Sequence, residues 1–282
     1  MLAPVPGDAR PLDPAALDEL RRARALLEHP GIAAQLANLV GAPLEYVMAR
    51  RLPPAASRLV DALVRKALQQ SLRAALATLG PGPAPARTRS HAAAAATSGA
   101  IGGAFGLAGL AIELPLTTTL ILRSIAGIAR AEGEALDDPG TMLACFEVLT
   151  MGGRSRGDDG AESGYFAARA MLAQQVAAAT EYLAVHGLAG RGGPLIVQLL
   201  SAIASRFSVN VNQKLALQAV PVIGAATGAA LNALFMRHFQ AMARGHFVVR
   251  RLERHHGAEA VRVAYRALAG EKQDARDGAG LG

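Results

Sequence analysis

Two isolated charges are the residues of this sequence whose placement most suggests chemistry. Glu113 is the only charged residue in the 31 residues 92–122, and Lys214 is the only one in the 30 residues 207–236. A carboxylate or an ammonium group that is buried without a partner costs several kcal/mol, so each must be neutralised or meet an opposite charge. We therefore expect Glu113 and Lys214 to form an ion pair, directly or through one water.

Other polar residues in or beside these segments could share a site with the pair. Arg123 and Arg206 are alternative partners for Glu113. The threonines 117–119 could line a ligand pocket, although bonding to the backbone after Pro115 is the simpler interpretation. An architectural role is likewise simpler for the ion pair than a catalytic one. The candidate polar cluster consists of Glu113, Thr118, Arg123, Lys214, Asn232 and His238.

Motifs for familiar catalytic chemistry are missing from the sequence. No Gly-x-Ser-x-Gly nucleophile motif occurs, the glycine-rich stretch is not followed by the Lys-Ser/Thr of a phosphate-binding loop, and no His-Glu-x-x-His motif marks a zinc site. Cys145 follows apolar residues inside an expected helix, which suits a buried, inert thiol. We expect no metal and no cofactor, and the catalytic residues, if any, remain unknown.

The two uncharged segments are the elements that must position Glu113 and Lys214. Five glycines in the first fall within an arc of about 120° when placed on a helix. Each glycine weakens an isolated helix by ~1 kcal/mol relative to alanine, and close approach of a second helix, around Gly224 and Gly228, would compensate. Small residues, Pro115 and Pro221 argue against simple membrane spans, while a membrane-inserting hairpin stays an alternative. The five glycines are Gly99, Gly102, Gly103, Gly106 and Gly109.

Helical periodicity dominates the rest of the chain, and no convincing strand pattern appears. The sequence predicts an all-α fold, a multi-helix bundle with two central Gly/Ala-rich, nearly charge-free helical segments. Asp13 and Asp138, each followed by proline, mark two helix starts. Helices are expected over residues 14–27, 31–39, 43–51, 54–79, 139–151, 163–186, from about 195, from 222, and over 261–268.

A Gly-Pro stretch at residues 80–85 is the strongest candidate boundary. We expect an N-terminal helical extension over residues 1–90, a helical core over 91–269 and a disordered tail over 270–282.

Composition and charge indicate the cellular location of the protein and the classes of partner that it could bind. The 282 residues carry a net charge of +7 and one cysteine, which excludes a scaffold held by internal disulfides. No signal-peptide pattern is visible, so we expect a cytoplasmic location.

The basic amphipathic helix over 54–79 and the Arg-rich end of the chain suggest an anionic membrane surface as a partner, although a solvated surface is the simpler interpretation. Few aromatic residues interleave with the basic ones, so no specific nucleic-acid site is expected. The arginines of that end are Arg244, Arg250, Arg251 and Arg254.

Three blocks of sequence resemble the EcsC protein family: residues 99–134, which include the Glu-Leu-Pro-Leu-Thr-Thr-Thr motif, 165–173, and 205–257, which include Val-Pro-Val-Ile-Gly-Ala. Residues before about 90 lie outside the strongest similarity. The resemblance implies a bacterial helical protein named after a gene neighbour of an ABC transporter, with no established reaction. It favours a non-enzymatic accessory protein at the inner membrane face beside transport machinery. The alternative is a hydrolase or small-ligand-binding protein with a polar pocket around Glu113, Lys214 and His238.

Overall fold

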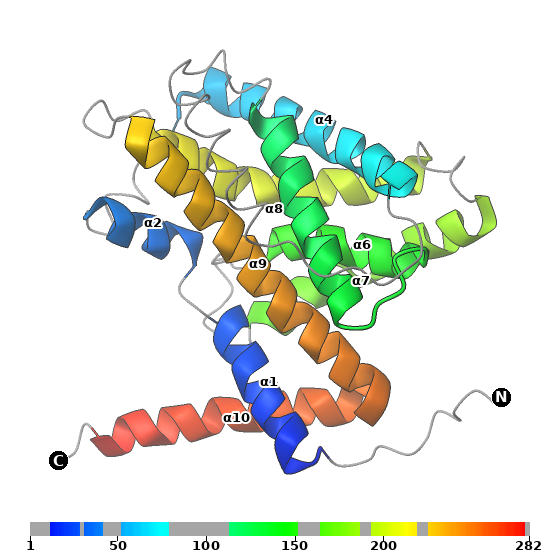
Figure 1. Cartoon of the computed structure of the whole chain (residues 1–282), viewed down its shortest axis with the longest axis vertical. Helices are drawn as coiled ribbons and strands as arrows, with labels where there is room; N and C mark the ends of the chain where they lie inside the picture. The colour runs from blue at the N-terminus through cyan, green and yellow to red at the C-terminus, as the bar shows by residue number, and fades with distance from the viewer. Residues whose placement is uncertain are drawn as a thin grey trace.

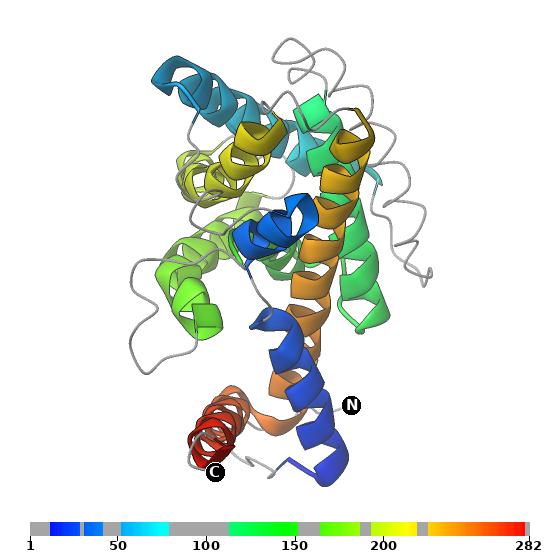
Figure 2. The same ribbon diagram turned by 90° about the vertical axis from the view of Figure 1, so that its left-hand side faces the viewer.

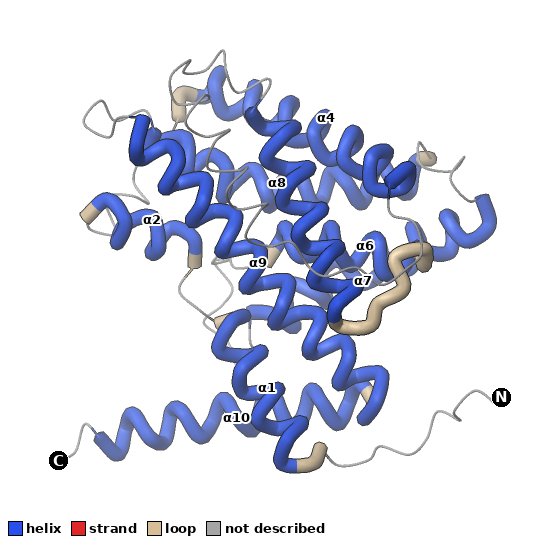
Figure 3. The backbone as a smooth tube through the Cα atoms, viewed as in Figure 1, coloured by secondary structure: helices blue, strands red, loops and turns tan. Residues whose placement is uncertain are grey.

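The chain forms a helical bundle without strands in the part that the computed structural model describes (Figures 1 and 3). This confirms the predicted all-α fold. The described residues are 12–28, 31–41, 52–78, 113–151, 164–186, 193–218 and 225–279. The helices are α1 (Pro14–Leu27), α2 (Ile32–Val40), α4 (Pro54–Thr78), a helical segment over 113–131, α6 (Pro139–Glu147), the 3-10 turn η1 (Val148–Thr150), α7 (Gly164–His186), α8 (Pro194–Gln218), α9 (Ala225–His256) and α10 (Ala258–Ala279).

Two helix starts follow directly from local sequence. The side chain of Asp13 accepts a hydrogen bond from the backbone N–H of Ala16 at 2.7 Å, and that of Asp138 accepts one from Thr141 at 2.7 Å. Each aspartate precedes a proline at the first helical position, where the missing N–H costs nothing. The predicted starts of α1 and α6 are therefore confirmed.

Helix α9 is the longest of the helices whose bounds the structure describes, and other helices of the bundle pack against it (Figures 1 and 2). α1 packs along it, whereas α4 packs on α8 at the other end of the molecule. At Gly245 of α9, an added Cβ would lie 2.6 Å from Cγ of Leu27 and 2.8 Å from the carbonyl oxygen of Ala23, both in α1. Glycine thus permits a tight helix crossing between α9 and α1.

The second uncharged segment, 207–236, is divided between two helices, because α8 ends at Gln218 and α9 begins at Ala225. Among the described residues, 194–216 of α8 form a helix long and apolar enough to cross a membrane, and half of its most apolar window is buried inside the molecule. Length and composition are therefore weak grounds for a membrane span here.

Helix α10 runs from Ala258 to Ala279 and so includes residues 270–279 of the expected tail. The division into an extension, a core and a tail stays a prediction. Val261, Tyr265 and Leu268 anchor the first half of α10, and the polar extension contains helix-favouring Glu, Lys, Gln, Ala and Arg residues. The predicted helix at 43–51, the boundary at 80–90, and the glycine face at 99–109 lie outside the described residues.

Candidate functional site

Glu113 and Lys214 meet in the interior, as predicted. The Nζ atom of Lys214 lies 2.7 Å from Oε1 of Glu113, and each side chain is only 3% exposed. Asn232 donates a second hydrogen bond from Nδ2 to the same carboxylate oxygen, at 3.1 Å. The predicted ion pair is thus confirmed as a direct contact.

This buried ion pair joins three elements: Glu113 opens the helical segment 113–131, Lys214 belongs to α8, and Asn232 belongs to α9. Burial lowers the pKa of Lys214, and the charge and hydrogen bond of Glu113 oppose that fall. The ammonium group also lies 5.7 Å from the ring centroid of Phe235, a favourable cation–π distance. Two groups that neutralise each other in this way stabilise a specific arrangement of helices.

The other members of the predicted polar cluster do not all join the pair. Arg123 is exposed, so it lies outside the buried contact. The guanidinium of Arg206 instead lies 2.6 Å from Sδ of Met171 in α7. Neither arginine is therefore the partner of Glu113. His238 is buried, and its Nδ1 lies 3.1 Å from Nε2 of Gln35 in α2.

Thr119 bonds back to the backbone of its own helix and does not cap a helix start, because residues 113–131 are helical throughout. Thr118 is buried. Thr119 donates from Oγ1 to the carbonyl oxygen of Pro115 at 2.8 Å, and its hydroxyl lies 2.9 Å from that of Ser71 in α4. Bonding of this kind to the preceding turn is common for threonine in helices. A ligand-binding role for Thr118 stays a prediction.

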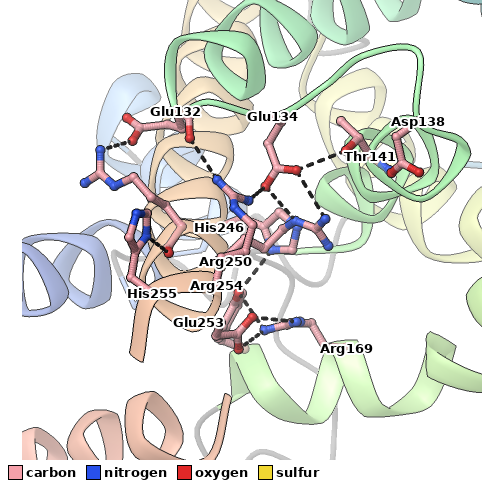
Figure 4. Close-up of polar contacts among 12 residues, drawn as sticks. Glu132, Glu134, Asp138, Thr141, Arg169, His246, Arg250, Glu253, Arg254 and His255 are labelled. Atoms are coloured by element: carbon pink, nitrogen blue, oxygen red, sulfur yellow. Dashed lines mark hydrogen bonds and ion pairs between the residues drawn. The ribbon is translucent and has the colours of Figure 1, made fainter. Parts of the chain in front are cut away.

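A second polar cluster, centred on Glu134, was not expected from the sequence (Figure 4). Its carboxylate is 5% exposed and accepts hydrogen bonds from Arg250 Nε at 3.0 Å, from Arg250 Nη2 at 3.3 Å and from Thr141 Oγ1 at 3.0 Å. Arg254 also donates to it. Burial raises the pKa of Glu134, but the hydrogen bonds and charges of the two arginines prevail, and its pKa is lowered overall.

Arg251, also in α9, forms two further ion pairs of the same kind with carboxylates from other parts of the bundle. Its guanidinium lies 2.6 Å from Glu132 and 2.6 Å from Glu19 of α1. Arg250, Arg251 and Arg254 of the Arg-rich end are therefore each paired with a carboxylate, and contact of this end with an anionic membrane surface stays a prediction. Of that group, Arg244 is exposed.

The cluster continues to α7, where Arg169 forms a bidentate ion pair with Glu253 of α9, at 2.7 and 3.1 Å (Figure 4). Nearby, the hydroxyl of Tyr165 lies 3.0 Å from Nδ1 of His246, which is fully buried. Burial, and then the charges of Arg169 and Arg250, lower the pKa of His246 well below its ordinary value. His246 is therefore neutral at physiological pH.

One further carboxyl group belongs to this region. Glu147, at the end of α6, is 6% exposed, and burial raises its pKa to about 7, against the opposing charges of Arg169 and Arg250. Sequence reasoning missed it because Glu147 sits among apolar residues without a distinctive motif.

Metal and thiol chemistry gain no support from the described residues. Within the described ranges, no group of three or more His, Cys, Asp or Glu side chains is placed to hold a metal ion. Cys145 is buried, as expected, and burial raises the pKa of its thiol to about 12. A thiol of that kind is unreactive as a nucleophile.

Comparison with curated proteins and with solved structures finds no significant match. A comparison with protein families does find one: the EcsC protein family matches residues 15–252. The match begins within α1 and so includes the N-terminal helices that we expected to lie outside the strongest similarity. It also covers both members of the buried ion pair and most of the Glu134 cluster, but it ends before Glu253 and Arg254. This chain therefore belongs to the EcsC protein family.

Proposed function

We propose that this protein is a non-enzymatic accessory protein that binds the anionic inner face of the cytoplasmic membrane, beside transport machinery, through helix α4. The observation that carries the proposal is a contrast between two sets of cations. The arginines near the end of α9 are paired with carboxylates, whereas the exposed cations of α4 form no ion pair with the residues that the structure describes.

The exposed face of α4 carries three cations. Arg58, Arg65 and Lys66 are exposed, and none of them forms an ion pair with any residue in the described part of the chain. Leu59, also on this face, is 46% exposed. The only acid of α4 is Asp61, and α8, which packs against α4, contains none. A basic helix face with an exposed apolar residue is typical of proteins that rest on anionic lipid surfaces.

The expected strength of binding is modest. A Lys or Arg side chain near an anionic leaflet contributes about 1 kcal/mol, so the three cations contribute roughly 3 kcal/mol together. Binding of that size is reversible and sensitive to salt, as befits a peripheral protein.

The buried ion pair supports an accessory role rather than a hydrolase. Glu113 and Lys214 are directed at each other, and Asn232 bonds to the carboxylate. A general acid or base must instead reach the proton that it transfers in a substrate. These contacts hold the helical segment 113–131, α8 and α9 together, and this structural role accounts for the ion pair without a substrate.

Co-sedimentation with vesicles tests the proposal. Wild-type protein is mixed with vesicles of phosphatidylglycerol and phosphatidylcholine, and with vesicles of phosphatidylcholine alone. We expect binding to the anionic vesicles only, weakened about 100-fold in the triple variant Arg58→Gln, Arg65→Gln, Lys66→Gln.

A control variant that loses the same number of charges elsewhere on the surface tests whether binding depends on the α4 face or only on the net charge of the protein. The variant Arg22→Gln, Arg237→Gln, Arg244→Gln removes three exposed arginines from α1 and α9. It should retain most of the wild-type binding. Equal losses in both variants would contradict a specific role for α4, and no binding of the wild type would contradict the membrane proposal as a whole.

A further inference from the structure

The outer face of α7 and α8 exposes large apolar side chains to solvent. Met171 and Val185 of α7 are 62% and 75% exposed, more than any other large apolar side chain among the described residues. Leu195 and Val209 of α8 are exposed as well. Figure 2 shows both helices on the left side of the bundle. Apolar side chains that gather on one exposed face mark a surface that contacts another molecule.

The two helices run antiparallel, so these side chains share one surface. An added Cβ on Gly193, immediately before α8, would lie 2.5 Å from the ring of Tyr182 near the end of α7. Farther along α8, the guanidinium of Arg206 lies 2.6 Å from Sδ of Met171, near the start of α7. Leu195 precedes Arg206 by about three helical turns, so both side chains lie on the edge of α8 that borders α7.

Few charges interrupt this surface, and the two that do lie at opposite ends of α7. Residues 170–180 contain no charge, and Glu181 is exposed and forms no ion pair with any described residue. The guanidinium of Arg206 reaches across from α8 to Met171, ten residues before Glu181. The face of α7 therefore presents a positive charge and a negative charge about 15 Å apart along the helix.

We infer that this face binds a second copy of the chain, with the two α7 helices antiparallel about a two-fold axis near Ala177. A two-fold axis brings the opposite ends of the same face together, so Glu181 of each copy meets Arg206 of the other. Gln174 and Ala177, which are exposed and uncharged, lie near the axis. The small side chain of Ala177 lets the helices approach closely there.

The size and the charge of the face suit a second copy better than a membrane. α7 has 23 residues and is therefore about 35 Å long, and two helices side by side are about 20 Å wide. The face thus offers roughly 700 Å² per copy, close to the ~800 Å² that each partner contributes to a standard interface. An anionic leaflet would repel the carboxylate of Glu181, whereas a second copy supplies a cation for it.

Sedimentation equilibrium of the full chain, without lipid, tests the inference by exchange of charges. At micromolar concentrations we expect the wild-type protein to be a dimer. Glu181→Arg sets two cations against each other, and Arg206→Glu sets two carboxylates against each other, so each variant should raise the dissociation constant about tenfold or more. The double variant Glu181→Arg, Arg206→Glu restores opposite charges and should return to within about threefold of the wild type.

Variants elsewhere provide the controls. Asp18→Arg and Arg22→Glu reverse exposed charges of α1 and should leave the dimer unchanged. Ala177→Arg places a long cation at the two-fold axis and should give a monomer with the circular dichroism of the wild type.

Three outcomes would overturn the inference: a monomeric wild-type protein, a dimer that persists in Ala177→Arg, or a double variant that associates no better than the single ones. A monomer that binds uncharged vesicles, with that binding lost in Ala177→Arg, would assign the face to lipid instead. Self-association is measured without vesicles, so this inference and the proposed function fail separately.

Discussion

The side chain of Lys214 is 3% exposed, so its charge is stabilised by Glu113 rather than by water. Glu113→Gln removes the opposite charge and leaves the ammonium group buried. We expect a loss of about 3–5 kcal/mol in the free energy of unfolding, the range for breaking a buried ion pair. Lys214→Met, which leaves the carboxylate unpaired, should cost a similar amount in urea unfolding.

The double variant Glu113→Leu, Lys214→Met provides the sharper comparison. Replacing both charges by apolar side chains leaves no ion without a partner, so the double variant should be more stable than either single variant. Strict additivity of the two single losses would show that the two charges do not interact in the folded protein.

Glu147 gives the stability of the protein a distinct dependence on pH. Its pKa is about 7 in the folded protein and near 4.5 when unfolded, so folding takes up a proton between these values. The stability from protonated Glu147 is fully present below pH 4.5 and is lost as pH rises through 7. The rise in pKa corresponds to about 3 kcal/mol. Urea unfolding of the wild type and Glu147→Gln at pH 5 and pH 8 should reveal this difference.

The comparison with Glu147→Gln is necessary because His246 also contributes to the pH profile. Burial lowers the pKa of His246, so stability from its neutral form is lost as pH falls below 6.5. That contribution is the same in both proteins and cancels in their difference. Parallel profiles for the two proteins would contradict a titration of Glu147 near neutral pH.

Residue-scale prediction succeeded where a charge stood alone. Glu113 and Lys214 are conspicuous because their segments contain no other charge, and burial then demands a partner. Glu134 and Arg250 escaped prediction because they stand among many charged residues, 116 positions apart in the chain. Nothing in local sequence tells which of several carboxylates an arginine will meet.

At the scale of elements, the crossing of α1 and α9 depends on Gly245. An alanine there would place Cβ 2.8 Å from the carbonyl oxygen of Ala23, which belongs to the backbone and cannot move aside independently of the helix. We expect Gly245→Ala to destabilise the protein by about 1–3 kcal/mol. This loss would exceed the ~1 kcal/mol that alanine gains in helix propensity. A thermal midpoint equal to or above that of the wild type would show that the helices separate at little cost.

Helix starts could be predicted from the sequence far better than helix partners. Asp13 and Asp138 cap α1 and α6 through hydrogen bonds that span three residues, so the signal is local. The approach of α1 to α9 at Gly245 gives no comparable signal, because it joins residues more than two hundred positions apart. Sequence reasoning looked for helix crossings at the glycines of 99–109, which lie outside the described residues.

On the scale of the whole molecule, cations are distributed unevenly. The arginines where α9 meets α1 and residues 132–134 are paired with carboxylates (Figure 4). Those on the exposed face of α4, at the opposite end of the molecule (Figure 1), form no ion pair within the described ranges. Salt screens exposed charges strongly and partly buried pairs much less. The two groups of cations should therefore respond differently to ionic strength.

This difference predicts that salt separates membrane binding from stability. Raising NaCl from about 50 mM to about 500 mM should release the protein from anionic vesicles, because the Debye length falls well below 10 Å. The urea midpoint measured at the same two salt concentrations should change little, since the Glu134 carboxylate that Arg250 and Arg254 share is only 5% exposed and partly buried pairs are screened less than exposed charges. Retention on vesicles at high salt would instead indicate that apolar insertion, rather than the charges of α4, holds the protein at the membrane.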